Sequence, residues 1–92
     1  MSLTNNRYEE GTRYAHMTTG SAINRDGEAK LHRVVVNDVT AQTLTLYEGA
    51  TAAGEVIAVI DCNVGGTYEY GVTLTGLTGD LSGTADVTVI YQ

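Results

Sequence analysis

Short runs of alternating apolar and polar residues dominate this chain, and turn residues interrupt them at intervals of roughly 8–12 residues. The clearest run is QTLTLYE, residues 42–48, in which the leucines fall on one face of an extended strand and the threonines and tyrosine on the other. No segment shows the periodicity of an amphipathic helix. The pattern therefore predicts an all-β fold, a single small antiparallel β-sandwich or jelly roll of about six to eight strands.

Composition and turn signals agree with this fold. The chain has 14 Thr and 6 Tyr, which favour strands, 11 Gly, which favour turns, and no Pro, Trp or Phe. Asp26-Gly27 and residues 76–83 predict turns, and Gly71 predicts a bulge within its strand. EVIAVID, residues 55–61, is nearly all apolar, which predicts a strand covered on both faces. The expected strands are residues 12–19, 30–38, 42–48, 55–61, 67–76 and 84–92.

The length of 92 residues predicts one domain, and a domain of this size buries only roughly 60–65% of the surface of its unfolded chain. We expect an N-terminal arm over residues 1–11 and a β-sandwich domain over residues 12–92. The arm is either a frayed terminus or a segment that becomes ordered on a partner through Arg7 and Tyr8. No apolar run is long enough to span a membrane, and the polar start predicts no signal peptide.

Charge is distributed unevenly along the chain, whose net charge is −6. Residues 34–92 carry seven acidic side chains and no Lys or Arg, and this acidic body argues against a nucleic-acid partner. The asymmetry suits head-to-tail or side-by-side protein contacts, although a solvated surface with accidental sorting remains the alternative. All five cations lie in the first 33 residues: Arg7, Arg13, Arg25, Lys30 and Arg33.

Residues that carry chemistry are sparse. His16 and His32 each lie within an expected strand, and neither has a second ligand at the spacing of a zinc site. Cys62 has no partner for a disulfide within the chain, and we expect it to be a small, partly buried side chain. No serine lies in a Gly-x-Ser-x-Gly elbow. The sequence therefore predicts a protein that is not an enzyme, with no catalytic residue, no metal site and no cofactor.

The tyrosines leave two interpretations open. Tyr47, Tyr68, Tyr70 and Tyr91 fall on expected strands. Together on an exposed sheet they would form a platform for a sugar ring. The other interpretation is that their rings pack against the sandwich and their hydroxyl groups reach water.

Two stretches of the chain carry a family resemblance. One is LTLYEGATAAGEVIAVID, residues 44–61, and the other is the closing strand GTADVTVIY, residues 83–91. Together they resemble the small β-sandwich capsid decoration proteins of tailed bacteriophages, also called cement or head-stabilising proteins. The likeness covers residues 30–92 and consists of strand and turn patterns.

The resemblance implies a virion structural protein on the capsid surface, which stabilises the capsid by bridging its subunits. Its partners would be the major capsid protein and its own copies, as a homotrimer, with no nucleic acid or membrane involved. On this hypothesis Arg7, Tyr8, Arg13 and Tyr14 contact the capsid or a neighbouring subunit. The alternative is a carbohydrate- or receptor-binding module of a phage fibre or tail. A third interpretation is a bacterial adhesion or accessory domain with no link to a virion.

Overall fold

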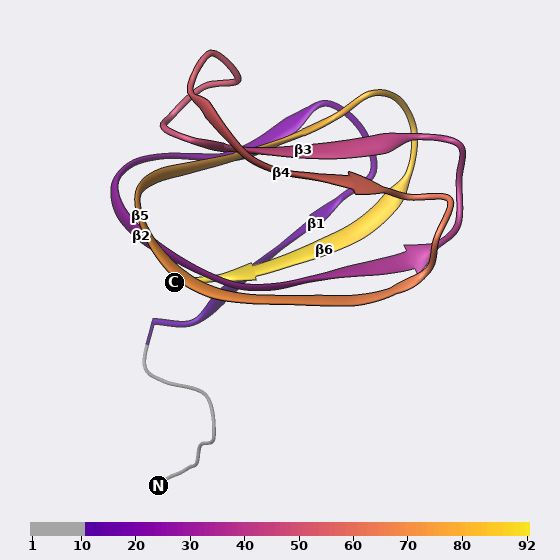
Figure 1. The fold of residues 1–92 in the computed structure, drawn as a ribbon, viewed down its shortest axis with the longest axis horizontal. Coiled ribbons are helices and arrows are strands. Elements are labelled where there is room, and N and C mark those ends of the chain that lie inside the picture. Colours follow the sequence, from indigo (N-terminus) through magenta and orange to yellow (C-terminus); the bar gives the residue numbers. More distant parts are fainter. Residues whose placement is uncertain (1–10) are drawn as a thin grey trace, which may run out of the picture.

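The computed structural model describes residues 11–92, which form one antiparallel sheet of six strands in the order β1-β6-β2-β5-β3-β4 (Figure 1). The all-β prediction is confirmed, and no helix that could cross a membrane occurs among these residues. Of the expected arm, residues 1–10 lie outside the described part of the chain. The strands are β1 (Arg13–Met17), β2 (Ser21–Asp38), β3 (Thr43–Glu48), β4 (Glu55–Asp61), β5 (Gly66–Leu81) and β6 (Asp86–Tyr91).

Two long strands turn this single sheet into a sandwich. β2 has 18 residues and would be roughly 60 Å long if straight, yet the longest dimension of the molecule is 42 Å. β2 and β5 therefore bend, and Figure 1 shows them curving together around one side of the molecule. The C-terminal half of β2 pairs with β6, whereas the C-terminal end of β5 pairs with β3. We call the two halves of the folded sheet the β6 layer, which includes β1, and the β3 layer, which includes β4.

The turn predicted at Asp26-Gly27 is wrong, and the turn predicted at residues 76–83 is wrong for residues 76–81, whereas Ser82 and Gly83 do lie in the connection between β5 and β6. Asp26-Gly27 lies inside β2, where the register against β5 shifts between Asp26 and Ala29. Gly27 has a φ of 114°, so it forms an irregularity of the bend and the chain does not reverse there. Residues 76–81 continue β5, and Leu77 is fully buried. By contrast, the bulge predicted at Gly71 is confirmed, because the register shifts there and its φ is 67°.

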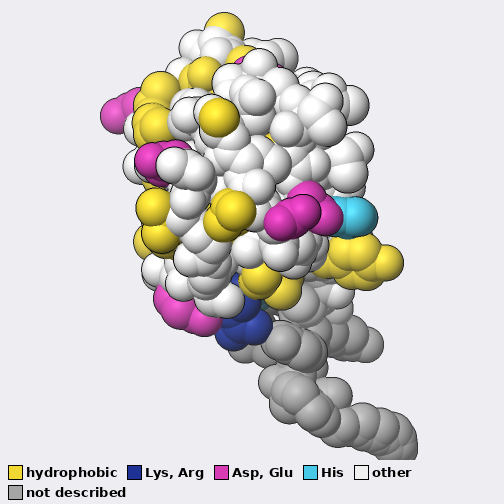
Figure 2. All heavy atoms as spheres, turned by 90° about the vertical axis from the view of Figure 1, so that its right-hand side faces the viewer, with side chains coloured by type: hydrophobic (Ala, Val, Ile, Leu, Met, Phe, Trp, Pro, Cys, Tyr) yellow, Lys and Arg dark blue, Asp and Glu magenta, His cyan; other side chains and the backbone are white. Residues whose placement is uncertain are grey.

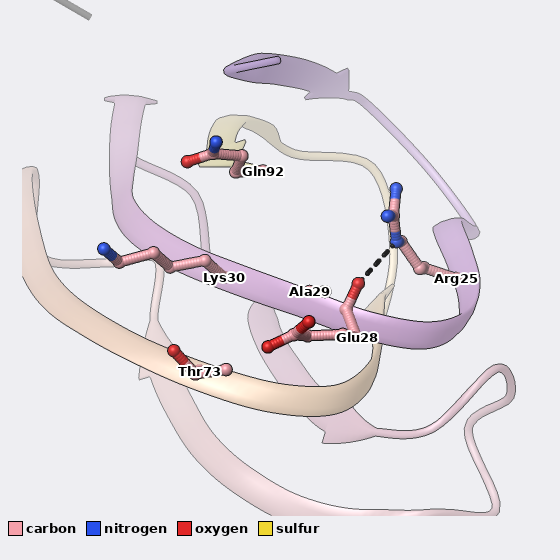
Figure 3. Close-up of a pocket in the computed structure, with 6 residues that line it drawn as sticks. All are labelled: Arg25, Glu28, Ala29, Lys30, Thr73 and Gln92. Carbon is pink, nitrogen blue, oxygen red and sulfur yellow. Dashed lines mark hydrogen bonds between the residues drawn. The ribbon is translucent and has the colours of Figure 1, made fainter. Parts of the chain in front are cut away.

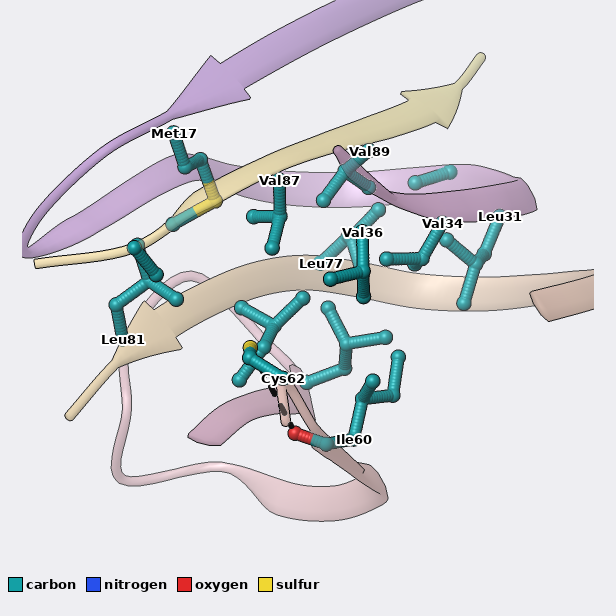
Figure 4. Packing of buried hydrophobic residues seen from close by; sticks show 14 of the residues in the cluster. Met17, Leu31, Val34, Val36, Ile60, Cys62, Leu77, Leu81, Val87 and Val89 are labelled. Carbon is teal, nitrogen blue, oxygen red and sulfur yellow. Dashed lines mark hydrogen bonds between the residues drawn. The ribbon is translucent and has the colours of Figure 1, made fainter. Parts of the chain in front are cut away.

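The core lies between the two layers and is built from the alternating apolar residues of the strands (Figure 4). Fully burying a Leu or Val side chain contributes about 1.5–3 kcal/mol each, so this cluster supplies the main stabilisation of the domain. The cluster consists of Met17, Ala29, Leu31, Val34, Val36, Leu44, Leu46, Ile60, Cys62, Leu74, Leu77, Leu81, Ala85, Val87 and Val89.

Hydrogen bonds and close backbone packing hold the β3–β4 hairpin against β5. Thr78 Oγ1 donates to Gly49 O at 2.7 Å. Glu48 Oε2 accepts from the Thr75 backbone N at 2.9 Å and from Thr75 Oγ1 at 3.0 Å. A Cβ at Gly76 would lie 2.8 Å from Gly49 Cα, so only glycine permits this approach of the two backbones.

The backbone of β2 is strained at residues 23 and 24, where the strand bends. Ile23 and Asn24 have φ angles of 76° and 48°, and the register against β5 shifts between Ala22 and Arg25. A left-handed conformation at a β-branched residue costs on the order of 1–3 kcal/mol. Asn24 Nδ2 donates to Ala50 O at 3.2 Å, which fastens the strained corner to the β3–β4 hairpin.

Candidate functional site

The two strands at the ends of the sheet, β1 and β4, are the candidate interaction surfaces of this protein. Each edge strand has one neighbour, β6 for β1 and β3 for β4, so one row of its backbone groups has no partner strand within the sheet. Such an edge can add a further strand from another chain.

The structure places two of the four predicted partner-binding residues on edge strand β1. Arg13 begins the strand and is exposed. Tyr14 is 72% exposed, whereas Met17, on the opposite face of the strand, is buried in the core. Arg7 and Tyr8 lie outside the described residues. Tyr14 therefore projects outwards, and its role in binding stays a prediction.

A row of side chains continues from Tyr14 across the outer face of the β6 layer. Tyr14 pairs in register with Ile90, and Ile90 pairs with Arg33 on β2. Arg33 Nε lies 3.1 Å from Glu69 Oε2 and 3.2 Å from Oε1, on β5. An exposed ion pair of this kind contributes roughly 0–1 kcal/mol, so it serves mainly to orient the Arg33 side chain.

A polar cluster next to this row links three strands. His16 Nε2 on β1 and Asp86 Oδ1 on β6 are 2.6 Å apart. Asn37 Nδ2 on β2 donates to the same oxygen at 3.1 Å and to Thr88 Oγ1 at 3.0 Å. The hydrogen bond from His16, and then that from Asn37, lower the pKa of Asp86. These contacts hold edge strand β1 onto the sheet.

The cluster was not predicted, because the sequence separates its members by up to 70 residues. His32 lies elsewhere, with its Nε2 3.3 Å from Gln92 Oε1. Within residues 11–92, no group of three or more His, Cys, Asp or Glu side chains is arranged to hold a metal ion.

The second edge strand, β4, exposes apolar side chains. Val56 and Val59 are 51% and 64% exposed. They pair in register with Tyr47 and Thr45, which share one face of β3, and the register shift at residue 57 keeps both valines on that outer face. The predicted cover on both faces of residues 55–61 is thus wrong, because residues 11–92 leave the outer face of β4 exposed. An apolar composition indicates that burial of the strand is favourable, but it does not show whether the residues that bury the strand belong to the same chain.

Acidic groups surround this apolar edge. Glu55 and Asp61, the first and last residues of β4, are both exposed. Figure 2, which faces the end of the molecule at the right of Figure 1, shows exposed hydrophobic and acidic side chains near one another, with Lys and Arg at one place near the bottom of the view. The β4 edge is therefore an apolar strip with an acidic rim, and a complementary partner would be apolar with a basic rim.

A shallow pocket lies where β2 bends, with a volume of about 330 Å³ (Figure 3). Arg25 Nε donates to the Glu28 backbone O at 2.9 Å, and Lys30 lies farther along the strand. Ligand sites are usually apolar clefts with a few convergent polar groups. This pocket is polar and mixed in charge, so it does not have that character. Its lining residues are Arg25, Glu28, Ala29, Lys30, Thr73 and Gln92.

The tyrosines of the expected strands do not form an exposed platform. Tyr68, Tyr70 and Tyr91 are partly buried and pack against the core. Tyr68 Oη donates to Val64 O at 3.1 Å, and burial raises the pKa of Tyr70. The interpretation in which the rings pack against the sandwich therefore describes these three residues.

Cys62 is fully buried in the core, and burial raises the pKa of its thiol. The sequence predicts a small, partly buried side chain there, and the structure buries it completely.

Comparison of the chain with protein-family models, with curated proteins and with solved structures gave no match. The two sheet edges and the charge distribution are therefore the observations from which a function is proposed.

Proposed function

We propose that this protein is a non-enzymatic virion structural protein that decorates a bacteriophage capsid and stabilises it by bridging capsid subunits. The observation that carries the proposal is edge strand β1, which begins with Arg13 and the exposed Tyr14. Tyr and Arg are the residue types most enriched among interface anchors. A small sandwich with anchors on an open edge suits a protein whose task is attachment.

Stabilisation of a capsid would follow from mass action. A protein that binds the assembled capsid, and not the separated subunits, shifts the equilibrium towards assembly by an amount set by its concentration and affinity. Two weak contacts made by one molecule on adjacent subunits reinforce each other through effective concentration. On this proposal the front of the chain, with Arg7, Tyr8, Arg13 and Tyr14, contacts the major capsid protein or a neighbouring copy, and the acidic sandwich faces outwards.

Co-sedimentation with capsids of the encoding phage tests the proposal. We expect saturable binding with a fixed ratio to the major capsid protein. Deletion of residues 2–11 and the variant Tyr14→Ala should each lower the bound fraction, while far-ultraviolet circular dichroism remains unchanged. Tyr47→Ala, on the other layer, is the matched control and should bind normally. Absence of binding to both precursor and expanded capsids would refute the decoration role.

A further inference from the structure

Four of the six large apolar side chains that are exposed within residues 11–92 lie on edge strand β4 and on the two connections beside its C-terminal end. These connections lie against each other, because Thr40 N donates to Cys62 O at 3.0 Å and a Cβ at Gly65 would lie 3.4 Å from Val39 Cγ1. The four side chains therefore follow one edge of the molecule, and we call them the valine strip. They are Val56, Val59, Val64 and Val39, which are 51%, 64%, 56% and 54% exposed.

Acidic side chains accompany the valine strip. One acid precedes Val39, one precedes Val56 and one lies two residues after Val59; they are Asp38, Glu55 and Asp61. All three are exposed, and none forms an ion pair with another residue of the described part of the chain. Residues 34–92 contain no Lys or Arg. A basic partner would therefore meet carboxylates that the domain itself does not neutralise, and such complementarity selects the partner and its register.

The pairing of β4 with β3 defines the spacing that a partner needs. Val59 pairs with Thr45 on the outer face of the β3 layer. Asp61 pairs with Thr43, two residues away, and so lies on the same face. The other side of β4 has no neighbouring strand in the sheet. In an extended segment placed there, an apolar side chain beside Val59 would put the residue two positions along the segment beside Asp61, where a basic side chain would meet the carboxylate.

We propose that the β4 edge binds an extended segment of another protein, in which a basic and an apolar residue are separated by one position. The segment adds to β4 as a further strand, so that backbone hydrogen bonds supply affinity and the contacts to Val59 and Asp61 supply specificity. A second copy of this chain fits less well, because β4 itself is acidic and Arg13 of β1 lies on the same face as the buried Met17. The inference goes beyond the decoration role and does not depend on it, since it concerns the edge opposite to the one that carries Tyr14.

Titration of a model peptide into the nitrogen-15-labelled protein, followed by nuclear magnetic resonance, tests the contact. The peptide is Lys-Thr-Val-Thr-Lys-Thr-Val-Thr-Lys with both ends capped, which places Lys and Val alternately on one face of a strand. We expect a Kd below about 1 mM, with chemical-shift changes confined to β4 and the valine strip. The control peptide, with Glu in place of each Lys, should not bind. Equal binding of both peptides, or changes spread over all the acidic residues of the domain, would overturn the proposal.

Two pairs of matched variants locate the contact. Val59→Thr keeps the branched shape and removes apolar surface, so it should weaken peptide binding by about threefold or more, whereas Val72→Thr, at a side chain on β5 that is 37% exposed, should bind normally. Asp61→Asn keeps the oxygen that accepts from the Asn63 backbone N and removes the charge, so it should weaken binding about two- to fivefold. Asp26→Asn makes the same change of charge at the bend of β2 and should bind normally. Equal losses in a variant and its control would show that the peptide does not bind at β4.

Sedimentation equilibrium of the protein alone decides whether a second copy takes the edge instead. Any self-association should be the same for wild type and Val59→Thr. A complex that Val59→Thr disrupts would assign the edge to a second copy and overturn the proposal, as would a protein that does not bind the peptide at millimolar concentration. Peptide binding by a protein that fails to bind capsids would support this contact and refute the decoration role.

Discussion

Substitution of Gly76 by Ala should destabilise the fold by about 2–3 kcal/mol. The added Cβ would lie 2.8 Å from Gly49 Cα and 2.9 Å from Arg25 O, and both are backbone atoms that cannot rotate away. Overpacking of this kind costs about 1–3 kcal/mol. Displacement of the hairpin also weakens the Thr78–Gly49 hydrogen bond, which is worth about 1 kcal/mol. The reduced entropy of the unfolded chain offsets roughly 0.4–1 kcal/mol of the total.

Urea denaturation followed by circular dichroism measures this effect. The midpoint should fall without a change in slope, and the melting temperature should drop by roughly 10 °C or more for a domain of this size. Gly65→Ala is the control, because its Cβ would meet only the Val39 side chain, at 3.4 Å. The control should stay within about 0.5 kcal/mol of wild type. Equal stability of the two variants would contradict the close approach of the hairpin to β5.

Three further predictions concern single side chains. Thr78→Val removes the hydroxyl that donates to Gly49 O and should lower the free energy of unfolding, measured with urea, by about 1–3 kcal/mol. The control Thr73→Val, at an exposed position, should lower it by less than about 0.5 kcal/mol. Equal losses would contradict the role of the Thr78 hydroxyl. The pKa of Asp86 is lower in the folded protein than in the unfolded chain, so ionised Asp86 stabilises the fold at pH values above its unfolded pKa, and this stabilisation is lost as the pH falls through its folded pKa. Asp86→Asn should therefore flatten the decline of the urea midpoint below about pH 4. An unchanged decline would refute this contribution of Asp86. Native Cys62 should react with iodoacetamide at least about a hundredfold more slowly than in urea, and equal rates would show that the thiol is accessible.

The all-β class could be predicted because alternation is a local property that survives folding. The leucines of β3 alternate with threonines in the sequence, and the structure buries Leu44 and Leu46 while Thr45 stays partly exposed. Burial on one face of a sheet repeats with a period of two, so the sequence records it directly. In β1 the structure likewise separates Tyr14, which is exposed, from Met17, which is buried on the opposite face.

The bends of the long strands could not be predicted from the same kind of signal. Asp26-Gly27 has the composition of a tight turn, yet β2 continues through it with a shift in register. A glycine signals an unusual backbone conformation, and this conformation serves a hairpin and a strand corner equally well. Only pairing with β5 distinguishes the two, and that pairing joins residues distant in the sequence.

The position of each strand within the sheet also could not be predicted from the sequence. Residues 55–61 are more apolar than residues 13–17, yet both segments form edge strands. The order of strands in the sheet depends on which segments, distant in the sequence, pair with each other. The composition of a strand depends instead on how much of its surface is buried. The exposed valines of β4 could be identified only from the structure, in which no strand within residues 11–92 covers them.

The pairing of β1 and β2 with β6 has a consequence for how the protein is made. Arg13 pairs with Tyr91 and Leu31 also pairs with Tyr91, so one residue of β6 completes ladders with two strands that come much earlier in the sequence. During synthesis, which proceeds at about 5–20 residues per second, β1 and β2 emerge well before β6 and cannot pair with it until it has been made. The β6 layer can therefore assemble only after β6, Asp86–Tyr91, has been translated. Until then β1 and its basic residues have no strand beside them, and a nascent chain that stalled before β6 would present them to any neighbouring chain.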